Sequence, residues 1–250
     1  MMTATRRTPS RSDIATVILG LEASGGLLSV ALWADGCIQA EQSHAARHGH
    51  AALIAPMVDA VMKAANCGFS DLSHIAAGRG PGSFTGIRVA LAMAKGLCLA
   101  TGVVGVGVNG LAALAAHYFT TSNLGEDAVL VSAETRRGPC YAQIFDRMGN
   151  ALTEIFESDI AKIAQHVPTG LDALSVIGWQ ADAIANVLRD GSHISVGRDA
   201  EPRIVDAGQI ATLAAAQIAS GQAEQSLSPL YLAPAFLGPS KNKPATGQKA

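Results

Sequence analysis

AAGRGPGSFTGIRVALAMAKG, residues 76–96, is the stretch that decides the fold of this chain. It leaves a short apolar run, passes through a glycine-rich loop and continues into an alanine-rich segment with almost no charge. The loop sets four glycines around one proline: Gly78, Gly80, Gly82 and Gly86. This order predicts a strand, a tight turn and a helix for which Ser83 is a natural N-cap residue. The stretch therefore predicts an α/β fold.

The loop has two interpretations on these residues alone. Backbone N–H groups at a helix N-terminus favour an anion, and Arg79 and Arg88 add positive charge. The phosphate-binding pattern GxxxxGK[ST] does not fit, because no lysine follows the glycines at that spacing. Glycine and proline can equally serve only to shape a tight connection. Phosphate contact and a purely structural turn both stay open.

Working outward from the loop, the apolar spacing predicts the same series of elements twice. Strands are expected at 15–24, 27–33, 37–43, 73–78, 102–108, 128–134, 139–146, 151–157 and 173–179. Helices are expected at 48–66, 83–100, 111–119, 181–188 and 207–219, with one more between 158 and 172. Two successive βββαβα units indicate an internal duplication, with two α/β subdomains that meet at a cleft.

The subdomain boundaries follow from this repeat. We expect residues 13–122 to form an N-terminal subdomain that carries partner-binding helices, and 123–237 a more divergent C-terminal one. Residues 1–12 and 238–250 are expected to be disordered tails.

Composition excludes several classes of protein. Hydrophobic residues make up 49% and charged residues 15% of the 250, which suits a compact fold and not a disordered chain. No apolar run reaches the roughly 18 residues of a membrane span. The four cysteines form no CxxC pair, which indicates free thiols in a reducing cytoplasm. They are Cys37, Cys67, Cys98 and Cys140.

The net charge of −2 hides an asymmetry between the chain ends and the body. Without six terminal basic residues, 12 basic residues face 20 acidic ones, so the body carries about −8. Such a body is not expected to bind nucleic acid broadly by itself. The six are Arg6, Arg7, Arg11, Lys241, Lys243 and Lys249.

Two further patterns are weaker than they look. Residues 105–110 spell GxGxxG, but the next expected strand opens the second half instead of continuing a dinucleotide-binding unit. His44, His48 and His50 have spacings that zinc sites use, yet no general base lies between them and surface histidines are favoured. We therefore expect no dinucleotide site, no metal site and no catalytic residues.

Two expected helices carry almost no polar outer face. Past its first turn the helix near 48–66 has only Asp59 and Lys63 as charged residues, and the helix at 83–100 has only Arg88 and Lys95. A helix on one side of a sheet should show a polar outer face, so both sides are expected to be covered. Burial inside the monomer is one explanation, and a protein–protein interface is favoured. The expected interface residues are Leu53, Met57, Val61, Ala65, Val89, Ala92, Met93 and Gly96.

At this point the residues carry a resemblance that covers most of the chain. The stretch at 78–100 resembles the signature of the TsaB family of tRNA threonylcarbamoyladenosine biosynthesis proteins, in the glycoprotease-like branch of the actin/Hsp70-type ATPase fold. Residues 17–33 are similar to that family's opening hairpin, 134–145 to its Asp-Ala-Arg-Arg-Gly-x-x-Tyr segment, and 227–234 to its Pro-x-Tyr-Leu segment. The resemblance implies a duplicated actin/Hsp70-like (ribonuclease H-like) fold.

The chain departs from this pattern at two carboxylates. Glu22 and Glu134 stand where family members usually have Asp, and in ATPases of this fold an Asp near the first turn holds metal and phosphate. The catalytic sister family, TsaD, has an HxxxH metal motif where this chain reads VNGLAALA at 108–115. The resemblance therefore implies a cytoplasmic subunit that is not catalytic alone and holds no tightly bound cofactor.

The resemblance also implies partners. These are a TsaD-like catalytic subunit, a TsaE-like ATPase and, through the complex, tRNA whose adenosine beside the anticodon receives a threonylcarbamoyl group. No membrane is implied, and a homodimer is expected when the chain is alone. The glycine-rich loop would chiefly set the start of an interface helix. A secondary ATP or ADP contact at the subunit junction would involve Gly80, Gly82, Ser83, Thr85, Gly86 and Arg88.

Two other functions are weighed against this one. A stand-alone ATPase or kinase of the same fold would need a metal-holding Asp and a phosphate-binding lysine. A glycoprotease-type metallopeptidase would need the metal histidines that are missing here.

Overall fold

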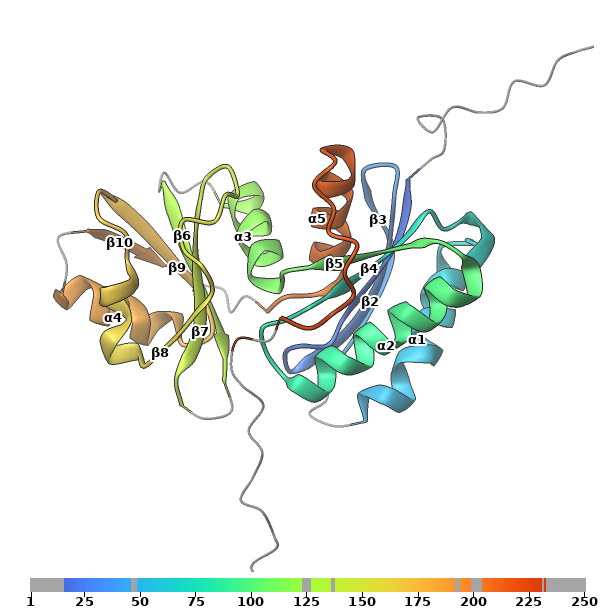
Figure 1. The fold of residues 1–250 in the computed structure, drawn as a ribbon, viewed down its shortest axis with the longest axis horizontal. Helices are drawn as coiled ribbons and strands as arrows, with labels where there is room; N and C mark the ends of the chain where they lie inside the picture. The colour runs from blue at the N-terminus through green and yellow to red at the C-terminus, as the bar shows by residue number, and fades with distance from the viewer. Residues whose placement is uncertain are drawn as a thin grey trace, which may run out of the picture.

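A computed structural model describes residues 16–45, 49–122, 127–135, 138–191, 194–198, 204–230 and 232. The expected tails at 1–12 and 238–250 lie outside these residues. Two five-stranded mixed sheets lie side by side, each covered by helices (Figure 1). We call them the N-terminal and C-terminal lobes.

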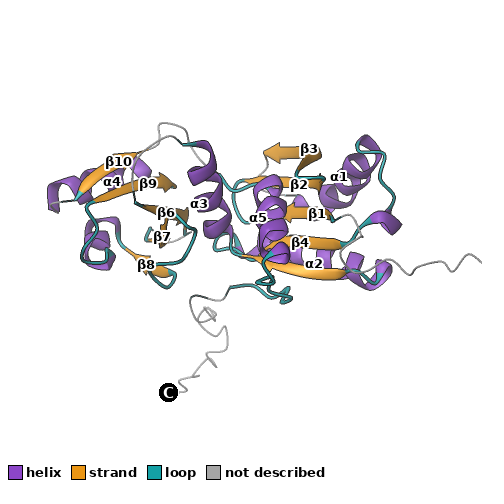
Figure 2. Ribbon diagram, turned by 90° about the horizontal axis from the view of Figure 1, so that it is seen from above, coloured by secondary structure: helices purple, strands orange, loops and turns teal. Residues whose placement is uncertain are grey.

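The N-terminal sheet has the order β3-β2-β1-β4-β5. Its first three strands form antiparallel hairpins, while β4 and β5 run parallel to β1. Their bounds are β1 (Val17–Glu22), β2 (Leu27–Ala34), β3 (Cys37–Ala45), β4 (His74–Gly78) and β5 (Val104–Val108). Strand β1 is buried along nearly its whole length because helices cover both faces of the sheet, which explains its unbroken apolar sequence. Figure 2 shows the two helix layers from above.

One layer on this sheet is formed by α1 (His50–Ala64) and α2 (Phe84–Thr101). Their buried residues, such as Ile54 and Leu91, join the core of the lobe. Helix α2 begins at its N-cap Ser83, as expected, and ends at Gly102, which adopts a left-handed conformation (φ +76°). A one-turn 3₁₀ helix, η1 (Phe69–Asp71), leads from α1 into β4.

The C-terminal sheet repeats the strand order of the first, as β10-β9-β6-β7-β8. Its strands are β6 (Ala128–Glu134), β7 (Cys140–Asp146), β8 (Phe156–Ser158), β9 (Ala173–Gly178) and β10 (Ser195–Arg198). Strands β6, β7 and β8 are antiparallel, whereas β9 and β10 are parallel to β6. The expected internal duplication is therefore confirmed.

This sheet differs from the sequence prediction at its edges. The strand expected at 151–157 is only β8, because Thr153 contacts the preceding strand through its side chain: Ile144 N donates to Thr153 Oγ1 at 3.1 Å. Strand β10 was not predicted, since four residues that pair with one neighbour leave little periodicity. The helix expected before β9 is the 3₁₀ helix η2 (Ile160–His166). Helix α4 (Ala181–Gly191) packs on the lobe's outer side.

Each lobe is completed by a helix from the other half of the sequence. Helix α3 (Gly110–Thr121) follows β5 in sequence but packs on the C-terminal sheet, where Tyr118 Oη donates to Ser175 Oγ at 2.7 Å. Helix α5 (Ala207–Ala219) belongs to the second half of the sequence but covers the N-terminal sheet. There Ala207 N donates to Ser29 Oγ at 2.8 Å. The expected boundary between 122 and 123 divides the sequence but not the packing, because α5 completes the first lobe.

Candidate functional site

The glycine-rich loop is held by backbone contacts on both sides. Gly80 O accepts from Gly110 N at 2.9 Å, and Ser83 N donates to Ser24 O at 2.6 Å in the β1–β2 turn. A Cβ on Gly82 (φ +150°) would lie 2.3 Å from Ser24 O. These glycines are needed because the turn and the loop approach each other closely. The loop thus fixes where α2 starts.

The structure does not bring the six expected nucleotide contacts together. Gly82 and Ser83 line the cleft between the lobes, whereas Thr85 and Arg88 line a groove beside α1. Gly80 and Gly86 are buried: a Cβ on them would meet Ile87 Cδ1 at 2.6 Å and Ala23 O at 1.8 Å, respectively. The guanidinium of Arg88 lies over the Phe84 ring, 3.7 Å from its centroid. The geometry therefore favours the structural interpretation of the loop.

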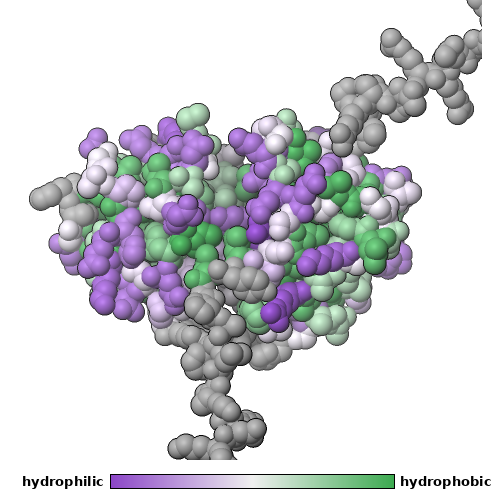
Figure 3. All heavy atoms as spheres, in the orientation of Figure 1, coloured by the Kyte–Doolittle hydropathy of each residue, from purple (hydrophilic) through white to green (hydrophobic). Residues whose placement is uncertain are grey.

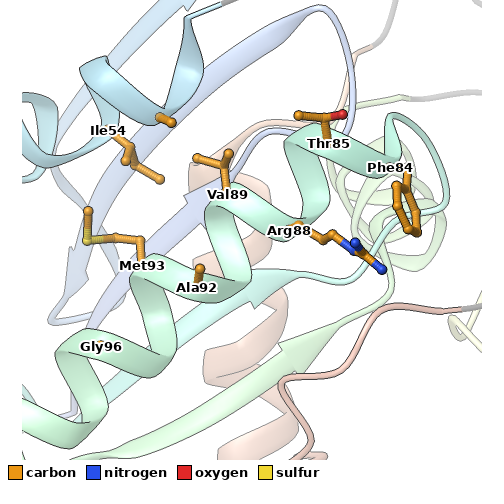
Figure 4. A pocket seen from close by; sticks show the side chains of 9 residues that line it. Ile54, Phe84, Thr85, Arg88, Val89, Ala92, Met93 and Gly96 are labelled. Atoms are coloured by element: carbon orange, nitrogen blue, oxygen red, sulfur yellow. The ribbon is translucent and has the colours of Figure 1, made fainter.

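A groove runs between the outer faces of α1 and α2, with a cavity of about 560 Å³. In Figure 4, Ile54, Val89 and Met93 point into the space between the helices, while Ala92 and Gly96 lie on the near side of α2. The lining is mostly apolar: Ala51, Ile54, Phe84, Thr85, Arg88, Val89, Ala92, Met93 and Gly96. Two large apolar side chains are exposed on α2, Phe84 at 50% and Leu99 at 89%. Hydrophobic colours prevail over this part of the surface in Figure 3.

The expected interface residues divide into exposed, half-buried and buried groups. Ala92 and Gly96 are exposed, and Leu53, Ala65, Val89 and Met93 are half-buried. Met57 and Val61 were wrongly assigned to the interface, because they are 4% and 2% exposed in the core of the lobe. They share the stripe of α1 that faces the sheet, and the exposed residues of this helix are alanines together with Pro56, Asp59 and Lys63. Phe84 and Leu99 are exposed on the same helix but were not among the expected residues, although a large apolar residue off the buried stripe is a usable signal.

Helix α2 is long and apolar enough, by length and composition, to cross a membrane. Its 18 residues have a mean hydropathy of 1.3, and 28% of them are buried. It lies on the sheet with Ala90 and Leu91 in the core, as a core helix of the same composition would. Most residues of α2 are at least partly exposed, which is unusual for so apolar a helix.

A cleft of about 670 Å³ lies between the lobes. The N-terminal lobe contributes the turn at Ser24 and the loop at Gly82, and the C-terminal lobe contributes Glu134 and Trp179. The described residues that line it include His50 but no lysine or arginine.

Glu22 lies at the end of β1, in the position where the resemblance implied an Asp that holds metal and phosphate. It is 0% exposed, and its Oε1 accepts a hydrogen bond from Ser24 N. Its Oε2 has no hydrogen-bond partner among the described residues. Burial raises the pKa of this carboxyl above its usual value, against the lowering effect of Ser24. A Cβ on Gly78 would lie 1.7 Å from Oε2, so that glycine makes room for the longer side chain. Glu22 is therefore a core group and is not among the residues that line the cleft.

The GxGxxG pattern at 105–110 has a packing explanation. A Cβ on Gly105 would lie 2.5 Å from Leu227 Cδ1, and one on Gly107 would lie 2.0 Å from Ser226 O. Both glycines lie beneath a segment that follows α5, and Gly110 begins α3. The pattern serves close packing against this segment, through the Leu227 side chain at Gly105 and the Ser226 carbonyl at Gly107.

The histidines and cysteines form no shared site in the described part of the chain. His44 is exposed on β3, His50 is buried at the start of α1, and His48 lies outside the described residues. No group of three His, Cys, Asp or Glu residues there could hold a metal ion. All four cysteines are free.

Two sheets of the same order, built by duplication around a central cleft, define the chain as a protein of the actin/Hsp70-like ATPase fold. The family model described as "TsaD: tRNA N6-adenosine threonylcarbamoyltransferase" matches residues 40–221. Within that family the chain belongs to the TsaB group of tRNA threonylcarbamoyladenosine biosynthesis proteins.

Individual relatives agree with this assignment. The chain is 31% identical to TsaB of Escherichia coli (strain K12), over 70% of this chain and 79% of that protein. It is 34% identical to TsaB of Haemophilus influenzae, over 41% of this chain and 43% of that protein. The structure of YeaZ from Pseudomonas aeruginosa has the same fold, with a TM-score of 0.73 and 24% identity over 87% of this chain and all of that one.

Proposed function

We propose that this protein is the non-catalytic subunit of a tRNA threonylcarbamoyltransferase complex and binds a TsaD-like catalytic subunit through the outer face of α1 and α2. The observation that carries the proposal is the apolar groove between these helices, with Leu99 89% exposed beside it. A monomer gains nothing from an exposed apolar face of this kind, whereas an interface does.

The chemistry of the face supports a helical partner. Small residues such as Ala51, Ala92 and Gly96 allow another backbone to approach closely. Phe84 and Leu99 are large enough to act as anchors in pockets of the partner. Charge is sparse: Asp59 and Lys63 of α1 pair with each other at 2.6 Å, and Arg88 and Lys95 are the charged residues of α2. Because the chain matches the TsaD family model, a TsaD-like protein of the same duplicated fold is the partner that we propose. When that partner is absent, a second copy of this chain would bind to the same face.

The rest of the assembly follows from what this chain lacks. The fully buried carboxyl of Glu22, which is not among the residues that line the cleft, supports a subunit without its own turnover. ATP or ADP would then bind at the subunit junction, near Ser83, or on a TsaE-like ATPase. Because the body of this chain is acidic, we expect tRNA to bind to the complex and not to this subunit alone. The complex would operate in the cytoplasm.

The test is a substitution at the centre of the α2 face. Ala92→Glu should bury an unpaired carboxylate in the complex, at a cost of several kcal/mol, and weaken binding by at least about a hundredfold. Because Ala92 is exposed in the monomer, the melting temperature should stay close to that of the wild type. Binding is measured by calorimetric titration with the TsaD-like subunit, and stability by thermal unfolding of the same preparation.

Ala216→Glu is the control, since Ala216 is an exposed alanine in the last turn of α5, which lies on the other face of the sheet. It should leave binding unchanged. Equal affinities of wild type and Ala92→Glu would show that α1 and α2 are not the interface.

A further inference from the structure

We propose that Arg79 is a positioning residue: it clamps the segment 224–230, here called the strap, across the edge of β5 and thereby fixes the loop from which α2 begins. The proposal rests on the proposed function, because the surface that it positions is the partner face of α2. Figure 1 shows the strap as the chain that descends from α5 past β5.

Arg79 contacts the strap through both side chain and backbone. Its Nε donates to Ser228 O at 2.6 Å, and its guanidinium forms an ion pair with Glu224. Its own carbonyl accepts from Leu230 N at 3.0 Å, while Glu224 O accepts from Gly107 N at 2.9 Å. The strap is thus bonded to the chain near both of its ends.

The burial of Arg79 makes these contacts necessary. Arg79 is only 9% exposed, although it carries a permanent charge. A buried guanidinium that loses its partners is strongly unfavourable. Removal of the strap takes away the partners of the Arg79 side chain. The backbone of the same residue donates through its N–H to Val108 O at 2.8 Å and lies next to Gly80, so the strap and the glycine-rich loop are linked through Arg79.

The strap also contacts the far end of α2. Leu227 packs against the core of the N-terminal lobe together with Leu97 and Cys98 of α2. A Cβ on Gly105 would lie 2.5 Å from Leu227 Cδ1 and 3.1 Å from Cys98 Sγ, so these side chains meet over that glycine. The strap thus touches the lobe at the loop before α2 and again near Leu99, the exposed anchor of the proposed interface.

The glycines of β5 show that the strap is built into the fold. Gly107 leaves no room for a side chain beneath Ser226 O, and Gly105 leaves none beneath Leu227. Two glycines in a five-residue strand weaken the strand, and the close approach of Ser226 O at Gly107 and of the Leu227 side chain at Gly105 accounts for that cost. The strap covers the edge that β5 would otherwise expose.

The experiment combines hydrogen exchange with partner titration on the full chain. Arg79→Gln should speed amide exchange at Gly107 and Leu230, and at Ile87 in the first turn of α2, by about tenfold or more, while amides of β6 keep their rates. Affinity for the TsaD-like subunit should fall by about tenfold. Arg79→Lys, which keeps the charge, should recover part of both effects.

Two further variants make the result decisive. Leu227→Ala removes the second attachment and should loosen the same amides; it takes the place of Arg79→Gln if that variant does not fold. Arg189→Gln removes an arginine that caps Val196 O in the other lobe and should change neither readout. Unchanged exchange at Gly107, Leu230 and Ile87, or unchanged affinity in a chain whose wild type binds, would overturn the proposal. If the wild type does not bind the partner, the proposed function fails, and the exchange rates still decide whether Arg79 holds the strap and the loop.

Discussion

Glu22 is the residue whose surroundings differ most from the role that its position suggests. Its carboxyl is fully buried with one oxygen unpartnered in the described structure, and it fits only because Gly78 opposite has no side chain. Burial is the largest cause of its raised pKa, and nearby Asp206 adds to it. A group in this environment carries its proton at a pH where surface carboxylates have lost theirs.

This raised pKa has a consequence for stability. The folded state holds the proton of Glu22 more tightly than the unfolded chain, so the associated stability is complete below the unfolded pKa of 4.5 and is lost as the pH rises through the folded pKa. Glu22→Gln cannot ionise and should escape this loss. It should be more stable than the wild type at pH 7, and the difference should shrink toward pH 4. Urea unfolding across this pH range measures both proteins, with the exposed Glu157→Gln as control. Parallel stability curves for wild type and Glu22→Gln would contradict the buried, protonated state.

At the scale of elements, most helices followed from hydrophobic spacing and their ends. Helix α5 was expected at 207–219 and is observed there, because Asp206 and Gln209 form a capping box before the apolar stripe. Short edge strands such as β8 and β10 were misjudged or missed, since a strand with one neighbour needs little apolar alternation. Met57 and Val61 show the same limit for helices: spacing identifies an apolar face but not what covers it.

The capping box of α5 can be tested directly. Asp206 Oδ1 accepts from Gln209 N at 2.8 Å, so Asp206→Ala should cost about 1 kcal/mol and lower the melting temperature by roughly 2–4 °C. Asp206→Asn keeps the cap and should recover most of the loss. Thermal unfolding by circular dichroism compares the three proteins. Equal losses in both variants would show that the charge of Asp206, and not its cap, is what matters.

For the whole molecule, the exchange of α3 and α5 makes each lobe depend on the other half of the sequence. Helix α5 covers β1 and β2, and Gly20 lets it approach so closely that a Cβ there would lie 2.4 Å from Ala207 O. Helix α3 is bonded to the C-terminal sheet through Tyr118. Neither half can bury its sheet alone, so the two lobes should unfold together.

The two tryptophans report on this cooperativity, because Trp33 lies in β2 and Trp179 lies at the end of β9, in the other lobe. Trp33→Phe and Trp179→Phe each leave one fluorescent reporter. Both variants should give one denaturant transition, and after correction for the stability that each substitution removes, the midpoints should coincide with those from circular dichroism. A separate, earlier transition seen by one reporter would show that the lobes unfold independently.

By itself, the sequence determined the duplicated α/β fold, the approximate positions of α1 to α5, the family and the apolar character of α2. These features arise from local periodicity and from a long glycine-rich motif at 76–96, which neighbouring residues specify among themselves. Only the tertiary structure decided that Glu22 is a buried core group, that the glycines of β5 lie under the strap, and that α5 completes the N-terminal lobe. Each of these depends on residues far apart in the chain, and no local pattern records which backbone will pass over a glycine or which helix will cover a sheet.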